Sequence, residues 1–164
     1  MRWMSLQGCS VMARETRLWS WLKDGTKHLP YLHMRRVENL VSEGDPDVDG
    51  CHQGVYFEAE LKGCDRPARG GKLGFEVRRS QVLWHRRRWK AGGNLWLYIR
   101  VGFGKDVARY LVPGNLTGQI FEGVTEADLV RMSVLPPKHT PVEALQAMLA
   151  GRQATAPSST DPLT

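Results

Sequence analysis

The expected fold of this 164-residue chain follows first from one acidic segment. The segment reads Gly44-Asp45-Pro46-Asp47-Val48-Asp49-Gly50-Cys51-His52-Gln53-Gly54-Val55-Tyr56-Phe57-Glu58-Ala59-Glu60-Leu61-Lys62. Its middle, Gln53-Gly54, has the residue types of a two-residue hairpin turn. A turn at this point places Asp47 opposite Glu60 in an antiparallel hairpin.

The two faces of the predicted hairpin differ in polarity, because side chains alternate along a strand. One face carries Asp47, Asp49, Cys51, Tyr56, Glu58, Glu60 and Lys62. The other carries Val48, Gly50, His52, Val55, Phe57, Ala59 and Leu61. Only the second face can pack in a hydrophobic core, so the charged face must be solvated or functional.

The opposed carboxylates of Asp47 and Glu60 indicate a cation site. Like charges directly opposite one another destabilise a hairpin, whereas Mg²⁺ binds one or two carboxylates together with water and substrate phosphate. Lys62 projects from the same face, toward the same ion. Two carboxylates and a lysine favour metal-dependent cleavage of phosphodiesters. The hairpin alone leaves a second interpretation open, a solvated outer face without catalytic function.

Periodicity and capping residues predict the elements around the hairpin. We expect a helix over residues 13–23, strands over 32–39, 94–101 and 108–112, and a helix over 81–90 capped by Ser80. Thr125 and Thr140 begin capping boxes of two C-terminal helices. Glu15 in the first helix is either an acid favoured by the helix dipole or a third carboxylate of the cation site. The predicted class is α/β, with a mixed sheet flanked by helices.

Composition and charge limit the possible partners and the location. The formal net charge is +6, and residues 65–90 carry nine lysines or arginines against two acids, which favours a polyanionic partner. The three cysteines suggest neither a disulfide framework nor a zinc site. With no transmembrane-length apolar run and no signal peptide, we expect a cytoplasmic protein.

The domain organisation expected from these patterns has one folded unit with two flanking segments. Residues 1–12 form an N-terminal extension, and residues 13–115 form the core. Residues 116–151 form a C-terminal helical extension, and residues 152–164 form a disordered tail rich in Ser, Thr, Ala and Pro.

The motifs Pro46-Asp47 and Glu60-Leu61-Lys62, in the order helix, strand, hairpin, helix, strand, resemble the PD-(D/E)xK nuclease superfamily. The surrounding residues look like the small phage-type, VRR-Nuc-like and Holliday-junction-resolvase-like members. The resemblance covers residues 15–112 and implies a restriction-endonuclease-like core. It implies a hydrolase that binds Mg²⁺ or Mn²⁺ and cuts DNA in repair or recombination.

The resemblance also implies a role for each motif residue. Asp47 and Glu60 would bind the metal, and Glu15 would complete the metal site. Lys62 would position or activate the attacking water, and Gln81 would assist it. Residues expected to contact the DNA backbone are Arg35, Arg36, Lys72, Arg78, Arg79, Arg86 and Arg87.

The leading hypothesis is therefore a metal-dependent DNA endonuclease, selective for branched or junction DNA and homodimeric. The alternative is a non-catalytic nucleic-acid-binding module on the same fold. A third and weaker hypothesis is an interaction protein whose C-terminal helices dock a partner. Only the first requires Asp47, Glu60 and Lys62 to converge on a metal.

Overall fold

The computed structural model describes residues 6–37 and 44–151, with side chains from residue 12 onward. In chain order the elements are α1 (Leu6–Thr26), β1 (Leu32–Arg36), β2 (Val48–His52), β3 (Val55–Cys64), α2 (Arg79–Lys90), β4 (Leu95–Val101), η1 (Gly104–Asp106), β5 (Ala108–Pro113), η2 (Gly114–Leu116), α3 (Thr117–Phe121), α4 (Glu126–Met132) and α5 (Pro141–Ala150). The expected disordered tail lies outside the described residues, as does the end of the strand expected over residues 32–39.

The sheet has five strands in the order β1-β2-β3-β4-β5. Every neighbouring pair is antiparallel except β3 and β4, which run parallel and are joined through α2. This confirms the expected class, a mixed α/β sheet flanked by helices. No helix in residues 6–37 or 44–151 is both long and apolar enough to cross a bilayer.

The register of the hairpin is the one expected from the sequence. Asp49 pairs with Glu58 and Cys51 with Tyr56, and the turn lies at Gln53-Gly54. Both turn residues have left-handed backbone, with φ of 49° at Gln53 and 83° at Gly54. A turn with two such residues matches the right-handed twist of the strands that it connects.

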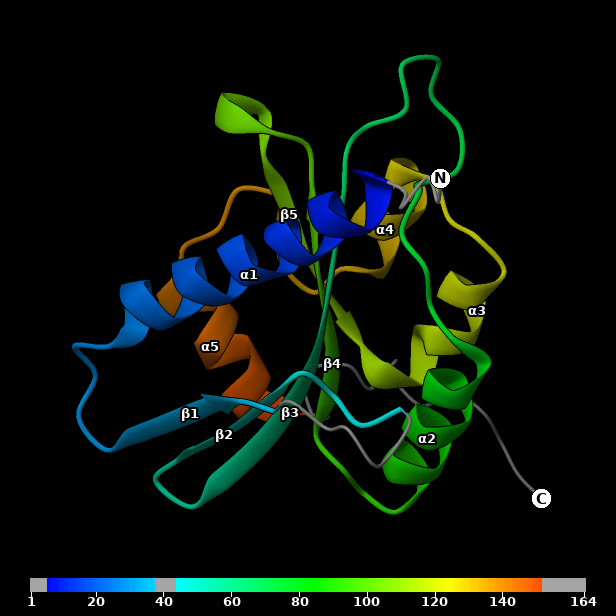
Figure 1. Ribbon diagram of the computed structural model, residues 1–164. Coiled ribbons are helices and arrows are strands. Elements are labelled where there is room, and N and C mark those ends of the chain that lie inside the picture. The colour runs from blue at the N-terminus through cyan, green and yellow to red at the C-terminus, as the bar shows by residue number, and fades with distance from the viewer. Residues whose placement is uncertain (1–5, 38–43, 152–164) are drawn as a thin grey trace.

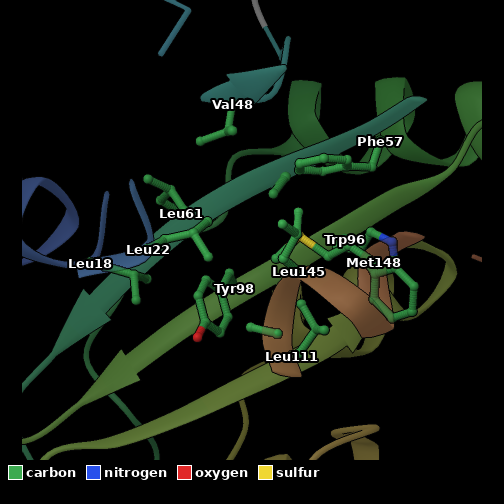
Figure 2. Packing of buried hydrophobic residues seen from close by; sticks show 12 residues of the cluster. Leu18, Leu22, Val48, Phe57, Leu61, Trp96, Tyr98, Leu111, Leu145 and Met148 are labelled. Atoms are coloured by element: carbon green, nitrogen blue, oxygen red, sulfur yellow. The ribbon is translucent and has the colours of Figure 1, made fainter. Parts of the chain in front are cut away.

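Helices cover both faces of the sheet (Figure 1). On one face, α1 and α5 pack over β3, β4 and β5. Figure 2 shows the helix residues Leu18, Leu22, Leu145 and Met148 in one cluster with the strand residues Leu61 and Tyr98. On the other face, α2, α3 and α4 cover Leu97, Ile99, Tyr110 and Val112. The segment expected to be a C-terminal extension therefore contributes to both hydrophobic cores.

Two helix starts differ from the expectation. The first helix begins at Leu6 rather than residue 13. Helix α2 begins at Arg79, with Arg78 rather than Ser80 at the N-cap, because the Gln81 side chain accepts the Arg78 backbone N–H at 2.9 Å. The capping boxes at Thr125 and Thr140 are confirmed.

Candidate active site

Asp47 lies directly before β2, where the hairpin ladder ends. Its Oδ2 accepts a hydrogen bond from the Leu61 backbone N–H at 2.8 Å. The carboxylate thus satisfies a backbone donor of β3 just past the last paired residues, Val48 and Ala59. This bond fixes the Asp47 carboxylate beside the strand that carries Glu60 and Lys62.

Glu60, Lys62 and Gln81 form a closed hydrogen-bonded group between β3 and α2. Glu60 Oε1 lies 2.9 Å from Lys62 Nζ and also accepts from Gln81 Nε2. Gln81 Oε1 in turn accepts from Lys62 Nζ at 3.4 Å. The side chains of Glu60 and Lys62 are buried, since the two residues are only 1% and 8% exposed.

The carboxyl groups of Glu60 and Asp47 both have raised pKa values. Burial and the neighbouring Asp47 charge raise the pKa of Glu60 to about 7, although Lys62 opposes the shift. Burial also raises the pKa of Asp47, against the Leu61 N–H and the positive charges of Lys62 and Arg36. The charge of Asp47 is among the causes that raise the pKa of Glu60, and a side-chain interaction with Glu60 is among those that lower the pKa of Asp47. The two carboxyl groups therefore belong to one electrostatic group.

Glu15 joins the same electrostatic group from α1. Burial raises its pKa, Lys62 lowers it and Asp47 raises it. Glu15 precedes the core residues Leu18 and Leu22 by three and seven positions, so it lies along the buried stripe of the helix. Packing of that stripe on β3 brings the carboxylate to the site.

Gly63 permits this close approach of α1. A Cβ atom at position 63 would lie 2.6 Å from the Cβ of Arg14, closer than side-chain atoms pack. The glycine follows Lys62 directly in β3. The backbone of α1 can therefore pass over the strand beside the catalytic lysine candidate and place Glu15 there.

The donor set fits a hard divalent cation. Glu60 Oε2 is buried, and no N–H or O–H donor in the described part of the chain reaches it. No group of three or more His, Cys, Asp or Glu among residues 12–37 and 44–151 is arranged to hold a metal. Mg²⁺, however, usually takes one or two carboxylates and completes its coordination with water and phosphate. Asp47 and Glu60 could supply that pair.

His85 belongs to this neighbourhood, although the sequence analysis did not single it out. It lies one helical turn after Gln81 on α2 and is fully buried. Its Nδ1 lies 2.8 Å from Thr117 Oγ1. Because the Thr117 hydroxyl already donates to the Gly114 carbonyl, Nδ1 is the donor and Nε2 is left as an acceptor.

The acceptor nitrogen of His85 is buried and has no hydrogen-bond partner within the described residues. Burial, and then the charge of Lys62, lower the pKa of His85 to about 4. The imidazole is therefore neutral at physiological pH. The only sequence signal for this residue is its spacing of four from Gln81 on one helix.

The predicted backbone-contact residues do not all reach the site. Arg36 does: it donates to Thr16 at 3.0 Å, and its charge lowers the pKa of both Asp47 and Glu15. Arg35 forms an ion pair with Asp49 at 2.9 Å. Lys72 instead donates to the Glu122 carbonyl after α3. The remaining predicted contact residues occupy exposed positions in α2 or directly before it: Arg78, Arg79, Arg86 and Arg87.

Comparisons with known proteins give a structural similarity of low extent. No protein-family model matches the chain, and no curated protein matches it. Among solved structures, the chain is similar to Hjc, a Holliday junction resolvase of the archaeal hyperthermophile Archaeoglobus fulgidus. The TM-score is 0.42 and the identity 14%, over 71% of this chain and 97% of the resolvase chain. The functional roles proposed below rest on the site itself.

Proposed function

We propose that this protein is a metal-dependent deoxyribonuclease that cuts phosphodiester bonds at the Asp47–Glu60–Lys62 group. The observation that carries the proposal is the buried Glu60 carboxyl beside Lys62 and the half-buried Asp47, with no described residue donating a hydrogen bond to Glu60 Oε2. Burying such groups is unfavourable unless they are paired or bind a metal. A hairpin face with a purely structural role would not require a buried carboxyl group without a donor.

The proposed roles follow from the contacts of each residue. Asp47 and Glu60 would hold Mg²⁺ or Mn²⁺, and Glu15 would add a third carboxylate or orient water. The bound cation supplies positive charge that stabilises the phosphate as it becomes more negative in the transition state. Lys62, held between Glu60 Oε1 and Gln81 Oε1, presents a fixed ammonium to the same phosphate.

Gln81 acts as a positioning residue in this scheme. Its Oε1 accepts from both the Arg78 backbone and Lys62, while its Nε2 donates to Glu60. Rotation of the side chain would break the contacts to the acid and the lysine together. The amide therefore fixes the relative positions of the two groups, and the N-terminal turn of α2 fixes the amide.

The proposed substrate is DNA, because the chain has a net charge of +6 and exposed arginines in and before α2. We further propose endonucleolytic cutting with selectivity for branched or junction DNA. A homodimer would present one cutting centre to each of two strands. Arg36, at the carboxylate group itself, is the contact residue best placed to neutralise a phosphate near the cutting site.

Cleavage of supercoiled plasmid and of a labelled four-way junction tests this proposal. We expect cutting with Mg²⁺ or Mn²⁺ and none with EDTA. Asp47→Asn and Lys62→Ala should each lower the rate by about 10²-fold or more, because each removes a charge that acts on the reacting phosphate.

The matched control is Glu58→Gln, an acid of the same strand and face. Its carboxylate pairs with Arg88 at 2.7 Å on the surface, and such exposed pairs contribute little stability. This variant should cut like wild type. DNA binding without cutting, under all metal conditions and on both substrates, would contradict the nuclease and leave a binding module.

A further inference from the structure

A second group of charged side chains lies at the same end of the sheet but on the opposite face. Arg100 of β4 and Arg109 of β5 are directly paired in the antiparallel register. Like charges directly opposite one another destabilise a sheet. Arg14 and Arg17 of α1 add to the positive charge, and both lower the pKa of Arg100, after the larger effect of burial.

The arginines of β4 and β5 have no anionic partner in the part of the chain that the structure describes. Arg100 is only 6% exposed, and its Nη1 is buried with no hydrogen-bond acceptor in the described residues. Arg109 Nε is likewise buried without an acceptor, while the guanidinium stacks 3.8 Å from the ring centroid of Trp21. A buried charge without a partner is strongly destabilising.

The acids of residues 12–37 and 44–151 do not neutralise this group. Asp65 is the carboxylate whose charge acts on Arg100, and Arg14 already pairs with it through Nε and Nη2. No carboxylate among the described residues pairs with Arg17, Arg100 or Arg109. The chain has no Asp or Glu before Glu15.

The outer side of the group is open and carries an aromatic ring. Arg17 is exposed, and its guanidinium lies 5.6 Å from the ring centroid of Phe103. Phe103 is itself 68% exposed, at the start of the turn between β4 and β5 that projects beyond the sheet (Figure 1). An arginine group with an exposed aromatic beside it matches sites that hold a backbone phosphate and stack a base.

We propose that Arg17, Arg100 and Arg109 bind a phosphate group of the nucleic-acid backbone, at a site separate from the cutting centre. Guanidinium groups match phosphate oxygens through paired N–H donors, and a bound anion relieves the like-charge pairing. Arg100 pairs in register with Gly63, the residue after Lys62. The two sites therefore adjoin in register, on opposite faces of the sheet.

The proposal depends on the proposed function only in naming nucleic acid as the source of the phosphate. Its test is a binding experiment in EDTA, so a failure of cleavage does not affect it. The variants are Arg100→Met and Arg109→Met, which keep most of the side-chain volume without the charge. The matched control is Arg131→Met, an exposed arginine of α4 paired with Asp128.

The first measurement is thermal unfolding with and without inorganic phosphate. Phosphate should raise the Tm of wild type and of Arg131→Met, with little effect on the other two variants. Without phosphate, Arg100→Met should melt at or above the wild-type Tm, because it removes a buried unpaired charge. A chloride-matched buffer controls for ionic strength.

The second measurement is the affinity for labelled junction DNA as a function of salt. Arg100→Met and Arg109→Met should bind about tenfold more weakly, with a slope of log K against log salt that is shallower by about 1. Phe103→Ala should weaken DNA binding without changing the response to phosphate.

The outcomes separate the two sources of phosphate. A phosphate-dependent Tm together with a changed salt slope supports the nucleic-acid site. A phosphate-dependent Tm with wild-type DNA affinity and slope in both variants overturns it in favour of a free phosphate ligand. No phosphate effect and unchanged DNA binding overturn the site altogether.

Discussion

At the scale of single residues, the carboxylates could be predicted and the histidine could not. Asp47, Glu60 and Lys62 share a face because a two-residue turn fixes the register of one local hairpin. His85 acquires its environment from Thr117, which lies 32 residues away along the chain. Nothing local in the sequence places those two side chains together, so the buried imidazole is visible only in the structure.

His85 should make the stability of the protein depend on pH. The folded pKa is about 4, whereas an unfolded histidine titrates near 6.5. As the pH falls between these values, the unfolded state takes up the proton first, so the folded state loses stability. His85→Asn removes this titration and retains an N–H that can reach Thr117.

Urea unfolding in EDTA at pH 7.5, 6 and 4 measures this effect. The free energy of unfolding of wild type, relative to His85→Asn, should fall by about 3 kcal/mol between pH 7.5 and 4. Taking the difference between the two proteins removes the contribution of the carboxyl groups that they share. A difference that does not change with pH would show that His85 is not buried as a neutral group.

At the scale of elements, the hairpin was predicted with its turn and register, and the starts of α1 and α2 were not. Ser80 is a favoured N-cap residue type, yet the N-cap is Arg78, two residues earlier, because the Gln81 side chain accepts the Arg78 N–H. That glutamine is also held by Glu60 and Lys62. The start of α2 therefore depends on the contacts that hold Gln81 at Glu60 and Lys62. Local capping preferences do not take such long-range contacts into account.

The hairpin turn offers a test at this scale, because Gln53 adopts left-handed backbone. Asn tolerates this conformation better than Gln, so Gln53→Asn should stabilise the protein by about 0.5 kcal/mol. Gly54→Ala should destabilise it by about 1 kcal/mol or more. No heavy atom lies within 4 Å of a Cβ at position 54, so the second effect would arise from backbone conformation alone.

Urea midpoints of the two turn variants and wild type provide the comparison. The predicted order of stability is Gln53→Asn, then wild type, then Gly54→Ala. A neutral Gly54→Ala, or a Gln53→Asn less stable than wild type, would mean that the turn does not have two left-handed residues.

At the scale of the whole molecule, the sheet separates two groups of charged side chains, one acidic and one basic. On one side, α2 closes over Glu60 and Lys62. On the other, α1 covers Arg100 and Arg109 and carries Glu15 toward the first site. The sequence predicted the acidic site because its residues are close in the chain. The arginine group depends on the pairing of β4 with β5 and the path of α1, so it required the structure.

For the C-terminal segment too, the local sequence predicted where the helices begin but not how they pack. Its capping boxes predicted where α4 and α5 begin. Their position against the sheet, with Leu129 in one core and Leu145 in the other, depends on contacts with strands far away in the sequence. We infer that this segment folds together with the sheet.

The most direct test of the cutting centre is calorimetric titration of Mn²⁺ into the protein without DNA. This measurement does not depend on choosing the correct substrate. We expect saturable binding to wild type and to Glu58→Gln, and its loss in Asp47→Asn and Glu60→Gln, because both carboxylates would hold the ion. Absence of binding to wild type, or binding that both site variants retain, would contradict a metal centre at Asp47 and Glu60.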